Sequence, residues 1–158
     1  MSCNRVGRGG SLATLGRMSA VKPQDLAERT FLFACNIVHF CMKLSTQPGV
    51  VRNIAWQLAD AGTSVAANYE EAKGSYSRRE FAAKSAIVLK EAREARLWLR
   101  VILACRLASE EEARPLYDEA NQLVGIFISS VRRLRGAQVL TSIVVTLLVV
   151  FVVSTFVF

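Results

Sequence analysis

The stretch over residues 57–100 constrains the fold most, because two helical patterns meet within it. Residues 73–76 (Lys-Gly-Ser-Tyr) interrupt the first pattern, and Ser77 begins the second, with Glu80 three residues later. Serine and glutamate at this spacing form a capping box, in which each side chain accepts a hydrogen bond from a backbone N–H at a helix start. The stretch therefore predicts a helical hairpin whose second helix begins at Ser77.

Apolar residues recur at steps of three and four in four segments, which predict helices over residues 24–44, 50–73, 78–107 and 110–135. The second of these is rich in alanine and contains Gly62, so its small side chains allow a neighbouring helix to approach closely. Short connections favour antiparallel neighbours. We therefore expect an all-α fold: an antiparallel up-down-up-down four-helix bundle over residues 23–135, with an additional C-terminal apolar helix.

Residues 1–22 contain four basic residues and no acidic residue, and they are rich in glycine and serine. This composition predicts a disordered basic leader. Two alternatives are an organellar presequence and a translation start at Met18, which would remove residues 1–17 from the mature protein.

The C-terminal segment over residues 136–158 has no charged side chain, and fifteen of its residues are Val, Leu, Ile or Phe. Residues 137–158, at 1.5 Å per residue, span about 33 Å, enough to cross a hydrocarbon core of about 30 Å. The segment predicts a transmembrane tail. Arg132, Arg133 and Arg135 precede it, and the positive-inside rule then keeps the bundle in the cytoplasm. The alternatives are a fifth helix buried in an oligomer and a chance extension of the gene.

The net charge of +7 is unevenly distributed, because residues 23–131 carry thirteen bases and thirteen acids. Within that neutral body, residues 77–107 have eight bases against three acids, whereas residues 108–131 have one base against five acids. On a helical wheel, the bases of the segment over 78–107 gather opposite Phe81, Ile87 and Trp98, which we expect on the core side. The predicted binding residues are Arg78, Arg79, Lys90, Arg93, Arg96 and Arg100.

Two interpretations of this basic stripe remain open. It can bind a polyanion, or it can be neutralised by an acidic helix of the same chain or of a neighbouring subunit. The acids available for the second interpretation in the same chain are Glu110, Glu111, Glu112, Asp118 and Glu119.

Catalytic and metal-binding patterns are not evident in the sequence. His39 is the only histidine, and the Glu-x-x-His pairs that carboxylate-bridged di-metal bundles require are absent. Cys3, Cys35, Cys41 and Cys105 have no paired spacing, so we expect buried thiols in a reducing compartment. We therefore predict a non-enzyme without cofactors.

Many short matches along the chain together resemble the four-helix bundle proteins of the 23S rRNA intervening-sequence family, over about residues 24–131. They are Gln57-Leu58, Ala61-Gly62-Thr63-Ser64-Val65, Asn68, Glu71-Ala72, Ser77, Glu80-Phe81, Lys84, Ile87, Lys90-Glu91-Ala92, Glu94 and Trp98-Leu99. The sequence departs from the family where Asn-Ile-Ala-Glu-Gly usually ends the second helix, since it has Asn-Tyr-Glu-Glu-Ala over 68–72. An arginine usual before the serine is replaced by Ser75 or Tyr76.

The resemblance implies a bacterial protein that assembles as a ring-like homopentamer. It also implies kinship with accessory bundle proteins of retroelements, which associate with RNA and reverse transcriptase. Our main hypothesis is a non-enzymatic oligomeric bundle that binds structured RNA or a nucleoprotein through the six basic residues. The alternative is a membrane-tethered scaffold that recruits a protein partner and uses residues 137–158 as its anchor.

Overall fold

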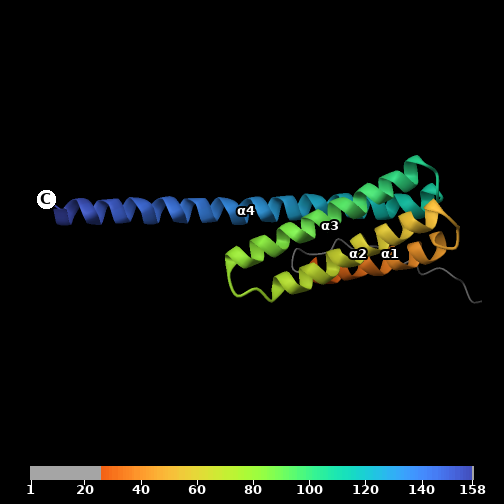
Figure 1. Ribbon diagram of the computed structural model, residues 1–158, viewed down its shortest axis with the longest axis horizontal. Coiled ribbons are helices and arrows are strands. Elements are labelled where there is room, and N and C mark those ends of the chain that lie inside the picture. The colour runs from red at the N-terminus through yellow and green to blue at the C-terminus, as the bar shows by residue number, and fades with distance from the viewer. Residues whose placement is uncertain (1–25, 158) are drawn as a thin grey trace, which may run out of the picture.

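The computed structural model describes residues 26–157, and side chains for residues 26–136 and Thr146. It contains four α-helices: α1 (Leu26–Leu44), α2 (Val50–Lys73), α3 (Arg78–Ala104) and α4 (Glu110–Val157), as Figure 1 shows. The described residues contain no strand, so the prediction of an all-α protein is confirmed. The predicted leader over 1–22 lies outside the described residues.

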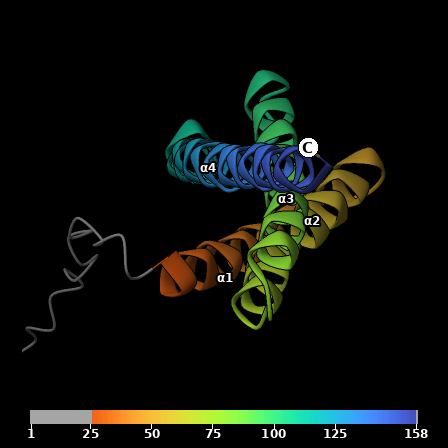
Figure 2. The ribbon, with the colours of Figure 1, turned by 90° about the vertical axis from the view of Figure 1, so that its left-hand side faces the viewer.

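Each helix packs along its neighbour in sequence, and α1 also contacts α4. The chain turns back at each of the three connections (Figure 1), and the view along the bundle shows four helices packed around a common centre (Figure 2). Because α1 and α3 lie diagonally across this bundle, the outward faces of α1 and α3 point to opposite sides of the molecule.

The start of α3 uses the predicted capping pair. Ser77 Oγ accepts a hydrogen bond from the Glu80 backbone N–H at 3.1 Å. The Glu80 carboxylate accepts one from the Tyr76 backbone N–H at 3.0 Å, one residue before the position usual for a capping box. This bond and the Lys84 side chain hold the pKa of Glu80 below its usual value. The predicted boundary between α2 and α3 is therefore confirmed.

The end of α3 comes three residues earlier than predicted, because Arg106 adopts the left-handed conformation with φ of 53°. The Arg106 N–H donates to the Leu103 carbonyl at 3.2 Å, and the Leu107 N–H donates to the Ile102 carbonyl at 3.0 Å. These two bonds form a Schellman motif, which satisfies carbonyl groups at a helix end and usually has glycine at the left-handed position.

The core is built from apolar side chains of all four helices. The largest fully buried side chains include Phe33, Ile37, Leu58, Val65, Leu99, Leu123 and Phe127. Trp98 is half-buried against this core, as predicted, and Phe81 is also half-buried. Ile87 was predicted on the core side as well, but its side chain is 45% exposed. That prediction is wrong because α3 packs on α2 and α4 only, and its buried stripe is narrower than half of the helix.

Gly62 allows α1 and α2 to approach closely. A Cβ atom placed on Gly62 would lie 2.6 Å from Cγ2 of Ile37, whereas carbon atoms in contact normally lie about 3.5–4.0 Å apart. Ile37 is fully buried among the core side chains. The close approach that the small residues of α2 predict is therefore present at Gly62.

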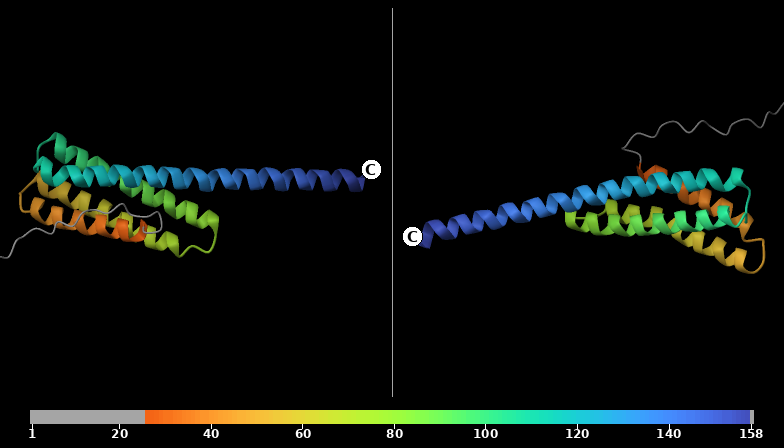
Figure 3. Two further views of the ribbon diagram at one scale, coloured as in Figure 1. Left: turned by 180° about the vertical axis from the view of Figure 1, so that it is seen from behind. Right: turned by 90° about the horizontal axis from the view of Figure 1, so that it is seen from above.

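The C-terminal segment does not form the separate fifth helix that we predicted, because its backbone continues α4 through residue 157 (Figure 3). Gly136 is the only helix-disfavouring residue at this point, and one glycine costs a helix about 1 kcal/mol, which is too little to end it. In the portion with described side chains, no helix is long and apolar enough to cross a membrane. The side chains on which the predicted transmembrane tail depends, 137–145 and 147–158, lie outside that portion.

Candidate nucleic-acid interface

The six basic residues predicted as a binding site lie on α3, from its outward face to the edge that contacts α4. We call these residues, Arg78, Arg79, Lys90, Arg93, Arg96 and Arg100, the basic face. Arg96 is half-buried, and the other five are exposed. The prediction placed them within one sector of a helical wheel, and the structure keeps them there because α3 is one uninterrupted helix from Arg78 to Ala104.

Most of the basic face has no partner in the described part of the chain. Arg96 Nη1 donates to Asn121 Oδ1 of α4 at 2.9 Å, a hydrogen bond to a neutral amide. Lys90 Nζ lies 3.5 Å from the Glu91 carboxylate, at the limit of a hydrogen bond, and remains 75% exposed. Arg78, Arg79, Arg93 and Arg100 make no hydrogen bond or ion pair with any described residue. Their charges are therefore available to a ligand.

The acidic residues of α4 do not neutralise α3, although this was one of the two interpretations of the sequence. Glu119 accepts two hydrogen bonds from Arg29 of α1, at 2.6 and 2.9 Å, and Glu112 pairs with Lys43 of α1 at 3.0 Å. Glu110 pairs with Arg114 on α4 itself. That interpretation is wrong within one chain, because none of the five acids forms an ion pair with α3 in the described residues, and Glu112 and Glu119 lie on the side of α4 that faces α1.

The ion pairs between α4 and α1 shift the pKa of two of the groups involved. Lys43, followed by the Ser109 hydroxyl, holds the pKa of Glu112 below its usual value. The hydrogen bonds from Arg29 to Glu119 raise the pKa of the Arg29 guanidinium further above neutrality. Glu112 and Glu119 are therefore bound to side chains of α1.

Two exposed aliphatic residues lie beside the basic side chains of α3. Ile87 is 45% exposed and Leu97 is 52% exposed. The sequence analysis did not place Leu97 on the surface, although its position about 160° from the buried Leu99 on the wheel, at about 100° per residue, indicates it. The surface of α3 therefore combines guanidinium groups, which bind phosphates by paired hydrogen bonds, with apolar contacts.

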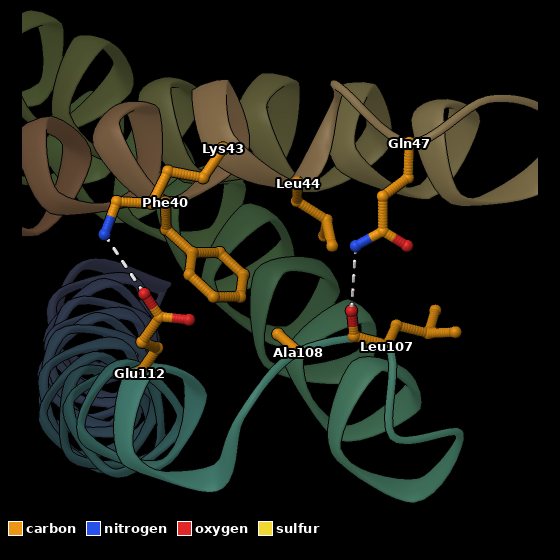
Figure 4. A pocket seen from close by; sticks show the side chains of 7 residues that line it. All are labelled: Phe40, Lys43, Leu44, Gln47, Leu107, Ala108 and Glu112. Atoms are coloured by element: carbon orange, nitrogen blue, oxygen red, sulfur yellow. Dashed lines mark hydrogen bonds and ion pairs between the residues drawn. The ribbon is translucent and has the colours of Figure 1, made fainter.

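A small pocket of about 90 Å³ lies at the end of the bundle where the α1–α2 and α3–α4 connections meet (Figure 4). Its apolar lining includes Phe40 and Leu44, and the ion pair between Lys43 and Glu112 lies at its edge. Gln47 Nε2 donates to the Leu107 carbonyl at 3.4 Å, which joins the two connections. The two contacts drawn in Figure 4 hold this end of the bundle together.

The packing of residues 26–136 adds no candidate residues for catalysis or metal binding to those considered in the sequence. His39 is exposed on α1, and in residues 26–136 no three His, Cys, Asp or Glu side chains are grouped to hold a metal ion. Cys41 is buried, which raises the pKa of its thiol to about 12. Cys35 is half-buried and Cys105 is exposed at the end of α3, so the prediction of buried cysteines is confirmed for Cys41 and is wrong for Cys105.

Comparisons with known proteins agree with this architecture. A family model described as 23S rRNA-intervening sequence protein matches residues 23–129. A crystal structure of a protein of unknown function from the S23 ribosomal protein family of Bacteroides thetaiotaomicron is 27% identical, with a TM-score of 0.61. The match covers 67% of this chain and 97% of that one. No curated protein matches the chain.

Proposed function

Because the chain belongs to the 23S rRNA-intervening sequence protein family, we propose that it is a non-enzymatic bundle protein that binds structured RNA. The ligand contacts the basic face of α3, either as free RNA or within a nucleoprotein. The observation that carries this proposal is the pairing pattern of the acids. The acids of α4 that form ion pairs do so with α1 or within α4, and none pairs with an arginine of α3 in the described residues.

Phosphate binding explains the type and spacing of these residues. Arg93, Arg96 and Arg100 follow one another at steps of three and four, so their guanidinium groups lie along one line of the helix. Each guanidinium offers a planar set of donors that fits phosphate oxygens. The body of the protein is neutral overall, so attraction to RNA depends on this local concentration of charge.

The test is a fluorescence titration of a labelled RNA hairpin with the protein at two salt concentrations. Phosphate contacts release counterions, so affinity falls as salt rises, and we expect the R93E/R100E variant to lose both affinity and about two units of the salt slope. The matched control is R52E/K73E, which makes the same change in net charge on α2. Equal losses in the two variants, or affinity that salt does not change, would contradict the proposal.

We also propose that the bundle, in an antiparallel up-down-up-down arrangement, assembles with copies of itself. This is supported by an exposed apolar line on α1, where Phe31 is 55%, Val38 38% and Met42 65% exposed. Their spacing of seven and four residues places them on one side of the helix. Light scattering after size-exclusion chromatography tests this, since F31K/M42K should lower the molar mass. An unchanged mass would exclude this face as the contact.

Free thiols and an RNA ligand are both typical of the cytoplasm, which is the compartment that we propose for the bundle.

A further inference from the structure

The two lateral sides of α4 are identified by its contacts. On one side, Glu112 and Glu119 reach Lys43 and Arg29 of α1. On the other side, Asn121 accepts the hydrogen bond from Arg96 of α3. Any further residue of α4 can therefore be assigned to the α1 side or the α3 side from its angular position relative to these contacts.

Arg132 and Arg135 fall on the α3 side. At about 100° per residue, they lie within roughly 20° and 40° of the direction of Asn121, whereas Arg133 lies about 120° away. Ile128, at an intermediate position on the same side, is packed against the core, which shows that α4 keeps this orientation beyond Asn121. All three arginines are exposed, and none makes a hydrogen bond or ion pair with a described residue.

The basic residues of the two helices lie along one seam. In Figure 1, α3 and α4 run in opposite directions and cross, and the two helices pack against each other. Arg132 therefore lies about 16 Å along the seam from Asn121, on the same side of it as Arg93, at about 1.5 Å per residue. From Arg100 to Arg135 the seam spans roughly 27 Å, which is the length of several phosphate spacings.

The α4 side of this seam is free of competing acids over most of its length. Residues 121–136 contain no Asp or Glu. Asp118 is exposed near the other end, where Glu110 and, to a smaller extent, Asp118 raise the pKa of the Arg114 guanidinium. Positive charge therefore continues from α3 onto α4 without an interruption by carboxylates between Asn121 and Arg135.

We propose that Arg132 and Arg135 join Arg93, Arg96 and Arg100 in one phosphate-binding surface at the seam between α3 and α4. Its ligand is structured RNA, so the inference rests on the function proposed above and extends the site to a second helix. It gives the three arginines that precede the apolar segment unequal roles, because only two of them face the seam.

The experiment compares R132Q, R135Q and R133Q in the full-length chain, with a fluorescein-labelled RNA hairpin as the probe. The three changes remove the same charge from neighbouring exposed positions, and circular dichroism confirms that each variant folds. We expect R132Q and R135Q to weaken binding several-fold and to lower the salt slope by about one unit each, and R133Q to change affinity less than about twofold.

Equal losses in all three variants would overturn the seam while leaving the basic face of α3 intact. If R93E/R100E binds RNA as the unaltered protein does, the proposed function fails, and the seam fails with it as an RNA surface. A parallel titration with phosphatidylserine vesicles tests whether the arginines bind lipid phosphates instead of RNA phosphates. Vesicle binding that depends equally on the three arginines, without an effect on RNA binding, would assign them to a membrane surface and refute the proposal.

Discussion

Replacing Gly62 by alanine tests whether the close approach of α1 and α2 is essential to the bundle. The new Cβ would lie 2.6 Å from Cγ2 of Ile37 and 3.0 Å from both Cβ and Cγ1. Because three atoms of one branched side chain surround it, rotation of Ile37 cannot remove every short contact. The helices must move apart or the side chain must leave its rotamer.

Two opposing contributions determine how much G62A changes the free energy of unfolding. Alanine in place of glycine stabilises a helix by about 1 kcal/mol, whereas an extra group in a packed core typically costs about 1–3 kcal/mol. The contact is about 1 Å too short against a fully buried residue, so the cost should lie in the upper part of that range. We expect G62A to lower the free energy of unfolding by about 1–2 kcal/mol.

The matched control is G125A in α4. Gly125 is exposed, and an added Cβ there meets no atom within 4 Å. This variant should gain part of the helix-propensity term and become more stable by about 0.5–1 kcal/mol. The two identical substitutions therefore change stability in opposite directions for reasons that depend only on packing.

Urea unfolding followed by circular dichroism measures both variants, at one protein concentration because self-association shifts apparent stability. A double-mutant cycle with I37A adds a second check. That change removes the clashing methyl groups, so it should cost less in the G62A background than in the unaltered protein. A G62A variant at least as stable as the unaltered protein, or no coupling with Ile37, would refute the reasoning.

The remaining predictions concern helix ends and thiols. S77A should lose about 1 kcal/mol by removing the cap of α3, as urea unfolding will show. The pKa of Glu80 is lowered in the folded protein. Its carboxylate therefore contributes to stability above its ordinary pKa of 4.5, and this contribution is lost as the pH falls through the lower folded pKa. E80Q should abolish that part of the pH dependence of thermal unfolding. R106G should stabilise the protein by up to about 1 kcal/mol, because glycine adopts the left-handed conformation without strain, and a lower melting temperature would contradict this. Maleimide should modify the exposed Cys105 at once, as mass spectrometry will show. Cys41 is buried and has a thiol pKa of about 12, so it should react only in denaturant. Equal labelling rates of the two thiols in the folded protein would disprove the burial of Cys41.

The sequence alone determined where the helices begin, because those signals are local. Ser77 and Glu80 are three residues apart, and their hydrogen bonds need no other part of the chain. The apolar steps that define four helices also lie within single segments. The end of α3 was harder to predict, because arginine at a left-handed position gives none of the signal that glycine would give.

Only the tertiary structure decided which charges remain available. The sequence showed a basic α3 followed by an acidic start of α4, and these could have paired. Which side of α4 faces α3 depends on how all four helices pack, and that packing directs Glu112 and Glu119 to α1. The same geometry separates Arg132 from Arg133, which are adjacent in the chain but point about 100° apart on a helix. Charge composition is a property of the sequence, whereas charge pairing depends on distances that exist only after the helices have packed.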